Sequence, residues 1–293
     1  MLQDMAHGRL ENEYLEKSPQ GNDPVLCIRG TEILLCRRPD DSLDLPTVDM
    51  VNRWAEEQGW ESWDETAFRY VFRHLDRDWF LWMGQTGEPA GADFHYEPAR
   101  GLRQRTSKEL CYGIMTGWHL YNWYRNNRFC GNCGAKTRHD GAERMVRCPE
   151  CGNMIFPRIA PAVIVAVTDG DRILLSRYAG RAVTFYALIA GYTEIGETIE
   201  QTVHREVMEE VGLRVKNLRY YKSQPWGVDG NVLMGFYCDL DGDDTIHLDE
   251  KELSAALWCH RDAIPVEDDG ISLTREMIRV FAEGREPKTE EIK

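Results

Sequence analysis

The stretch that decides the fold is GYTEIGETIEQTVHREVMEEVGL, residues 191–213. Thr198 and Gln201, three residues apart, match a capping box and predict that a helix begins here, while Gly212 predicts its end. Aliphatic residues recur at every fourth position between these ends: Ile199, Val203, Val207 and Val211. This spacing predicts an apolar stripe along one side of the helix, suited to packing on a sheet.

The same helix carries three glutamates, Glu206, Glu209 and Glu210, spaced i, i+3 and i+4. That spacing places their carboxylates on one face, beside the apolar stripe. Three such groups repel one another unless cations bridge them, and Mg²⁺ and Mn²⁺ prefer oxygen ligands together with substrate phosphates. The pattern therefore favours a multi-metal diphosphate site. A solvated acidic helix face is the alternative that these three residues alone leave open.

Upstream of this helix, four cysteines form two close pairs: Cys130 with Cys133, and Cys148 with Cys151. Fourteen residues separate the pairs, a spacing that favours a structural Zn²⁺ held by four thiolates with no open position for water. Redox-active CxxC pairs are one alternative. Basic residues nearby leave open a further role, contact of this ribbon with nucleic acid: Arg125, Arg128, Lys136 and Arg138.

Length and composition describe a globular chain. Its 293 residues favour two folded units, and 42% hydrophobic with 29% charged residues are ordinary values for a soluble protein. The formal net charge of −14 argues against a surface that grips long nucleic acid. No apolar run approaches the roughly 18 residues of a membrane helix. The first residues lack the pattern of a signal peptide, so we expect a cytoplasmic location and no membrane partner.

Apolar runs outline the remaining elements. Residues 25–37 contain two runs that meet at Arg29-Gly30 and predict a hairpin, and residues 66–82 predict further strands. Residues 107–124 predict a helix that Ser107 caps. Beyond the cysteines, two runs around Asp169-Gly170-Asp171 predict a strand pair, and a further strand is expected at 233–237. Mixed strands and helices indicate an α/β layer structure, followed by a solvated tail at 283–293.

Residues 191–213 also resemble a known motif, the Nudix box, at all nine of its specified positions. The wider chain, from about residue 107 to 282, resembles the NADH pyrophosphatase subfamily of Nudix hydrolases, also known as removers of NAD caps from RNA. The resemblance includes the cysteine segment, FPRIAP at 156–161 and SQPW at 223–226.

This resemblance implies a Nudix α/β/α sandwich with a mixed sheet, preceded by a zinc ribbon and an α+β N-terminal domain. The expected domains are residues 1–126, the N-terminal domain, residues 127–157, the ribbon, and residues 158–285, the Nudix domain. The implied reaction splits NAD(H) into NMN(H) and AMP. Its implied partners are a dinucleotide such as NAD(H), NAD-capped RNA 5′ ends and a second copy of the chain in a homodimer.

Site residues follow from the resemblance by position. Catalytic Mg²⁺ or Mn²⁺ would be held by four glutamates: Glu206, Glu209, Glu210 and Glu252. Arg205 would orient these glutamates, and Glu209 or Glu210 would accept the proton of the attacking water. Residues that would line the substrate pocket come from several segments: Phe156, Tyr192, Gln224, Trp226 and Asn231. For Phe156 and Tyr192, which would stack on a base, ordinary packing is the alternative.

One departure from the subfamily concerns substrate choice. After SQPW the subfamily continues Pro-Phe-Pro, one residue, Ser, whereas this chain reads Gly227-Val228-Asp229-Gly230-Asn231. Asn231 can replace the serine as a hydrogen-bond partner. The change bears on NAD preference rather than on hydrolysis. Two alternatives therefore stay open: a hydrolase of another nucleoside diphosphate derivative such as ADP-ribose, and a non-catalytic nucleotide-sensing regulator.

Overall fold

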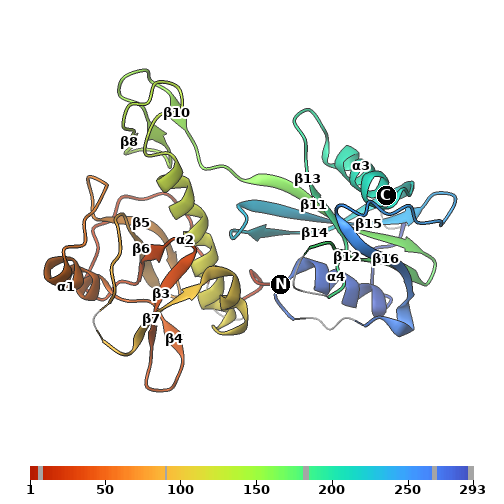
Figure 1. Cartoon of the computed structure of the whole chain (residues 1–293), viewed down its shortest axis with the longest axis horizontal. Helices are drawn as coiled ribbons and strands as arrows, with labels where there is room; N and C mark the ends of the chain where they lie inside the picture. Colours follow the sequence, from red (N-terminus) through yellow and green to blue (C-terminus); the bar gives the residue numbers. More distant parts are fainter. Residues whose placement is uncertain (6–8, 90, 181–184, 266–268, 290–293) are drawn as a thin grey trace. The chain divides into compact units, whose positions relative to one another are not determined.

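The computed structural model describes residues 1–5, 9–89, 91–180, 185–265 and 269–289 (Figure 1). The chain divides into two compact units. Unit 1 comprises Met1–Leu2, Ile159–Trp226 and Asn231–Lys293, and unit 2 comprises Gln3–Arg158 and Gly227–Gly230. No helix in the described ranges is long and apolar enough to cross a membrane. The expected division at residues 1–126, 127–157 and 158–285 stays a prediction.

Unit 1 is built on one mixed sheet of six strands. They are β11 (Ala160–Asp169), β12 (Arg172–Tyr178), β13 (Ile189–Tyr192), β14 (Val215–Trp226), β15 (Asn231–Leu240) and β16 (Leu253–His260). Their order is β14-β15-β11-β12-β16, and β13 pairs with β11. Strand β15 runs parallel to β11, and the other pairs are antiparallel.

Two helices cover the two faces of this sheet, α3 (Ile199–Val211) and α4 (Leu273–Ala282) (Figure 1). Successive residues of β11 point to opposite faces, as a strand requires. Val163, Val165 and Val167 pack in one core with the valines of α3. Ile164 and Ala166 pack in the other core with α4. The expected α/β/α sandwich with a mixed sheet is confirmed, although the sequence analysis did not foresee α4.

The strand pair expected around residues 169–171 forms, with Gly170 in the left-handed region at φ 58°. The two strands pair only at their near ends, Thr168 with Ile173 and Asp169 with Arg172. Over its first half β11 pairs with β13 instead, from Ala162–Tyr192 to Val165–Ile189. This arrangement brings β13 beside α3, which positions the candidate site.

The described residues of unit 2 form short strands, two α-helices and one 3₁₀ helix. Its strands are β1 (Val25–Leu26), β2 (Ile28–Arg29), β3 (Glu32–Arg37), β4 (Leu43–Asp44), β5 (Phe68–His74), β6 (Arg77–Trp82), β7 (Phe94–Pro98), β8 (Arg138–His139), β9 (Val146–Arg147) and β10 (Met154–Ile155). Its helices are α1 (Val48–Gln58), η1 (Ala99–Gln104) and α2 (Lys108–Asn126). The α+β composition is confirmed.

The expected elements of unit 2 are present. The hairpin joins β2 to β3, and the strands expected at 66–82 are β5 and β6. The expected helix is α2, capped by the Ser107 side chain, which accepts from the Leu110 N–H at 3.2 Å. Strands β8, β9 and β10 form a small antiparallel sheet that carries the cysteine segment. Helix α1 was not foreseen.

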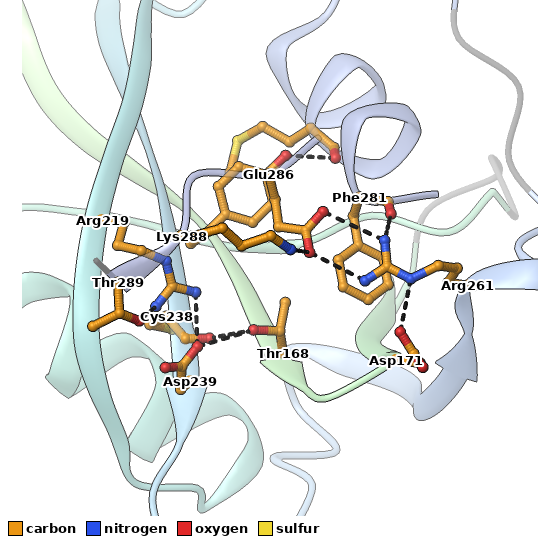
Figure 2. A network of polar contacts seen from close by, with 12 residues as sticks. Thr168, Asp171, Arg219, Cys238, Asp239, Arg261, Phe281, Glu286, Lys288 and Thr289 are labelled. Carbon is orange, nitrogen blue, oxygen red and sulfur yellow. Dashed lines mark hydrogen bonds and ion pairs between the residues drawn. The ribbon is translucent and has the colours of Figure 1, made fainter. Parts of the chain in front are cut away.

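The solvated tail expected at residues 283–293 is wrong at Glu286, which is buried, whereas most of the other described residues of the tail are exposed. Figure 2 shows Arg261 donating to the Glu286 carboxylate, with N–O distances of 3.1 and 3.4 Å. Arg219, which also binds Asp239, donates to the Thr289 hydroxyl. Burial raises the pKa of Glu286, but bonds from Arg261 and Lys288 outweigh burial and hold the pKa below its usual value.

Replacing Arg261 by alanine tests this contact. Arg261→Ala leaves the buried Glu286 carboxylate without its main partner, so we expect a loss of about 2–4 kcal/mol in the free energy of unfolding in urea at pH 7. Arg285→Ala is the control, because Arg285 pairs with the exposed Glu283 and should cost about 0.5 kcal/mol or less.

Acid weakens the same contact. Because the folded-state pKa of Glu286 is lowered, its stabilisation is present above the unfolded pKa and is lost as pH falls through the folded pKa. The difference in the free energy of unfolding between wild type and Arg261→Ala should therefore become smaller below about pH 4. If Arg261→Ala and Arg285→Ala lose the same free energy of unfolding at pH 7, Arg261 and Glu286 do not form a stabilising buried ion pair.

Candidate functional site

Helix α3 has the ends that the sequence predicted. The Thr198 side chain accepts from the Gln201 N–H at 3.2 Å, and the Gln201 side chain accepts from the Thr198 N–H at 2.8 Å. Gly212 ends the helix in the left-handed conformation, at φ 69°. Val203, Val207 and Val211 are fully buried against the sheet. The apolar stripe therefore fixes the rotation of the helix and, with it, the direction of its carboxylates.

The Glu206 side chain lies against the backbone of Gly191 on β13. A Cβ atom at position 191 would lie 1.9 Å from Cδ of Glu206, which is far inside van der Waals contact. Glu206 itself is only 8% exposed. A side chain at position 191 would therefore displace the Glu206 carboxylate, whereas glycine allows this carboxylate to lie at the edge between helix and sheet.

Arg205 connects the acidic residues of this site. Its Nη1 donates to Glu206 at 2.7 Å and to Glu209 at 2.9 Å. Its Nε and Nη2 donate to the two oxygens of Glu197 at 2.6 and 2.9 Å, and Nη2 also donates to the Tyr192 carbonyl at 2.8 Å. The hydrogen bonds from Arg205 to Glu197 are the largest cause that lowers the pKa of Glu197 to about 2. Arg205 thus ties α3 to the turn that precedes it.

Glu197 is a positioning residue that the sequence analysis did not select. Besides Arg205, it accepts from the Glu194 N–H and from the Thr202 hydroxyl, both at 3.0 Å. Its place in the Nudix-box pattern was the signal that could have identified it.

Glu210 is the most buried carboxylate of the set, at 2% exposure. Its Oε2 is buried and has no hydrogen-bond partner among the described residues. Burial, followed by the nearby charges of Glu206 and Glu252, raises the pKa of Glu210 to about 8. Burial also raises the pKa of Glu206. The charges of Glu209 and Glu252 raise this pKa further, whereas Arg205 lowers it. Such a set of crowded carboxylates is stabilised by a cation.

The carboxylate oxygens do not converge on a single point, but their arrangement fits several divalent ions that share ligands. Within the described part of the chain, only the cysteines form a group of three or more ligand atoms within 4.8 Å of one another. Glu252 is exposed and acts on Glu206 and Glu210 through its charge. In multi-metal sites, separate ions share carboxylates and substrate oxygens, so one compact cage is not required. Oxygen donors and the unpartnered Glu210 oxygen suit Mg²⁺ or Mn²⁺.

The ribbon cysteines form a compact tetrathiolate group. All four Sγ atoms lie within 4.8 Å of one another, with Cys130–Cys151 at 3.6 Å and Cys133–Cys148 at 3.4 Å. Zn–S bonds of about 2.3 Å in a tetrahedron give S–S distances of about 3.8 Å, so these separations fit Zn²⁺. Gly134 and Gly152 follow the two pairs at φ 78° and 74°, conformations that glycine adopts without strain.

Two asparagine amides bind sulfur across the ribbon. Asn132, in the first CxxC, donates to Cys151 of the second pair, and Asn153 donates to Cys130 of the first pair, both at 3.6 Å. Each knuckle of the ribbon thus supplies an amide to a sulfur of the other. Hydrogen bonds from outside the ligand set orient metal ligands and tune their charge.

Comparison with family models identifies both segments. Residues 158–281 match the NUDIX domain model, and residues 125–156 match the NADH pyrophosphatase zinc ribbon domain model. The chain carries a Nudix domain. An NADH pyrophosphatase zinc ribbon precedes it, so the four cysteines are the ligands of a structural zinc site and the acidic helix belongs to a fold that uses Mg²⁺ or Mn²⁺.

Curated relatives share these two segments. The NAD-capped RNA hydrolase NudC of Pseudomonas aeruginosa (strain PAO1) is 38% identical over 170 residues, 58% of this chain and 61% of the relative. The protein of that name from Pectobacterium atrosepticum is 43% identical over 149 residues, 51% of this chain and 57% of the relative. The chain thus spans about three fifths of the length of these relatives.

Among solved structures, a NUDIX hydrolase from Nitrosomonas europaea is similar, with 22% identity and a TM-score of 0.47. The match covers 54% of this chain and 92% of that chain.

Three of the residues expected to line the substrate pocket lie together in the Nudix domain. Asn231 pairs with Trp226 across the β14–β15 turn, and its amide donates to the Tyr192 hydroxyl at 3.2 Å. Asn231 is 7% exposed, and its Oδ1 has no partner among the residues described. Tyr192 is half exposed. This arrangement leaves one aromatic face and one buried amide oxygen available.

The other two expected residues lie elsewhere. Gln224 is fully buried, its amide donating to the Ile271 carbonyl and accepting from the Leu273 N–H, both at 2.8 Å. It therefore connects β14 to the start of α4, and both ends of its amide are engaged in the fold. Phe156 belongs to unit 2, where its ring is half exposed.

Substituting Gly191 tests the space reserved for Glu206. Gly191→Ala should displace the Glu206 carboxylate and weaken Mn²⁺ binding by about 10-fold or more, measured by electron paramagnetic resonance of free Mn²⁺. Gly101→Ala is the control, because nothing lies within 4 Å of a Cβ there. Unchanged Mn²⁺ affinity in Gly191→Ala would remove Glu206 from the ligand set.

Removing the two amides tests their effect on zinc. In Asn132→Ala/Asn153→Ala we expect zinc transfer to a colorimetric chelator to become about 10-fold faster or more. Asn52→Ala, on the exposed side of α1, serves as the control. Equal release rates in the double variant and wild type would show that the amides only fill space.

Proposed function

We propose that this chain is a metal-dependent hydrolase of the diphosphate bridge of NAD(H), yielding NMN(H) and AMP. The same cleavage at an RNA 5′ end removes an NAD cap. The observation that carries the proposal is the acidic set of α3, in which Arg205 ties Glu206 and Glu209 together while a buried Glu210 oxygen lacks a partner.

A diphosphate resists hydrolysis because its negative oxygens repel an incoming nucleophile. Bound Mg²⁺ or Mn²⁺ neutralises that charge and lowers the pKa of a bound water. Glu206, Glu209 and Glu210 would hold the ions, with Glu252 as a further ligand at the edge. Arg205 keeps Glu206 and Glu209 apart and correctly oriented through its bonds to Glu197. Glu209 or Glu210 would accept the water proton.

Support for a dinucleotide substrate comes from the ribbon and from the pocket residues. The ribbon model is named for NADH pyrophosphatase, and the curated relatives are named NAD-capped RNA hydrolases. Tyr192 offers an exposed ring for stacking on a base, and Asn231 an unsatisfied amide oxygen for an N–H donor. Phe156 would supply a second ring.

The second candidate is hydrolysis of another nucleoside diphosphate derivative such as ADP-ribose. The observation that favours it is the turn Gly227–Gly230, which replaces the Pro-Phe-Pro of the subfamily. This turn clusters with unit 2, where Asp229 pairs with Arg100. A non-catalytic nucleotide sensor is the third candidate, and the intact set of glutamates disfavours it.

The homodimer and the cytoplasmic location belong to this proposal as well. Light scattering tests the first, through a mass of about twice the 33.9 kDa of the chain.

Two isosteric substitutions test the catalytic site. Glu209→Gln and Glu210→Gln should each lower kcat for NAD in Mn²⁺ by at least about 100-fold, because each removes a ligand or the proton acceptor. Glu200→Gln, an exposed position in the first turn of the same helix, is the matched control. Wild-type rates in both site variants would refute the assignment.

The substrate is decided by product identification. We expect wild-type protein to convert NAD(H) to NMN(H) and AMP faster than it cleaves ADP-ribose, measured by chromatography with Mg²⁺ or Mn²⁺. A higher kcat/KM for ADP-ribose would favour the second candidate. Saturable NAD binding without turnover would favour the sensor.

A further inference from the structure

The end of α2 and the ribbon differ in charge from the rest of the chain. Residues 125–158 contain seven Lys and Arg but three Asp and Glu, whereas the whole chain carries a net charge of −14. One of these cations, Arg144, is partly buried and donates to two backbone carbonyls. The segment therefore carries a local excess of cationic side chains in an acidic protein, which favours an anionic partner.

Two adjoining pockets of unit 2 are lined by this segment, and in one of them earlier residues of α2 and Gly230 also take part. One has a volume of about 490 Å³ and the other about 400 Å³, and both are lined by Asn127 and Arg158. Together they form a groove, which we call the asparagine groove. Its walls carry five asparagines: Asn122, Asn126, Asn127, Asn132 and Asn153. Volumes of this size hold an organic ligand rather than a single ion.

Several polar groups of the groove are free to bind. Asn122 and Asn126 are one helical turn apart on α2, and neither side chain has a partner in the described part of the chain. The guanidinium of the exposed Arg158 likewise makes no hydrogen bond or ion pair with any described residue. The Arg158 backbone is fixed to α2, since its carbonyl lies 2.8 Å from Nε2 of His119.

Amide side chains, one free guanidinium and an aromatic ring fit nucleotides. Asparagine presents a donor and an acceptor side by side, which matches the edge of a base and adenine in particular. Arginine binds phosphate. Phe156, which the proposed function places on a base of the dinucleotide, also lines the groove. A peptide partner would be favoured by a more apolar floor, and a small anion would leave most of the amides unused.

We propose that the asparagine groove binds the first single-stranded nucleotides that follow the NAD cap of an RNA. This inference rests on the proposed function and adds a binding site for the RNA body to it. The groove reads base edges through Asn122 and Asn126, and Arg158 contacts a phosphate. Because few cations take part, the dependence on salt is shallow: log Kd rises with log salt concentration by about 0.7 per phosphate contact.

The test compares capped RNA, uncapped RNA and NAD on the full-length protein. In Asn122→Ala/Asn126→Ala we expect kcat/KM for an NAD-capped ten-nucleotide RNA to fall by about 10-fold, while kcat/KM for NAD stays within about twofold. Binding of the uncapped 5′-monophosphate RNA, followed by fluorescence anisotropy, should weaken by the same factor. In Arg158→Gln the slope of log Kd against log salt concentration for this binding should be smaller by about 0.7 than in wild type.

The matched control is Asn52→Ala/Arg53→Gln, which removes the same two kinds of side chain from exposed positions of α1. An equal loss on NAD and on capped RNA, or unchanged RNA binding in the groove variants, would overturn the proposal. A protein that fails to cleave NAD but loses RNA binding in the groove variants would refute the proposed function and leave the groove standing.

Discussion

The close approach of Glu206 to the backbone of Gly191 is the constraint on which the candidate site depends. Burying the valines of α3 contributes about 1.5–3 kcal/mol each and holds the helix against the sheet. The same packing forces carboxylates into a region where water cannot fully solvate them. Gly191 on β13 leaves room for the Glu206 carboxylate, and Arg205 compensates part of the negative charge.

This arrangement links stability to chemistry. Ionising Glu210 is costly in the absence of a cation, because its side chain is 2% exposed and the buried Oε2 has no partner among the described residues. Active sites concentrate such groups, since a site prepared for metal ions cannot also satisfy its ligands internally. Glu197 and Arg205 have a different role. They pair with each other and hold the candidate metal-binding glutamates in position.

Unit 2 contributes a different kind of order. The ribbon has only short strands, β8, β9 and β10, and gains its structure from four sulfurs around one point. The crossed amides of Asn132 and Asn153 join its two knuckles. The same segment also lines a pocket with three asparagine amides and one guanidinium, those of Asn127, Asn132, Asn153 and Arg158.

Local patterns determined much of this protein. The capping box, the valine stripe, the glutamate spacing and the two CxxC pairs each depend on neighbours within a few residues, so the sequence alone predicted α3, its acidic face and the cysteine group. Contacts between residues far apart in the sequence became visible only in the tertiary structure. The sequence could not place Gly191 against Glu206, turn both ends of the Gln224 amide toward α4, or dock Glu286 on Arg261, because these contacts arise only when the sheet brings separate segments together.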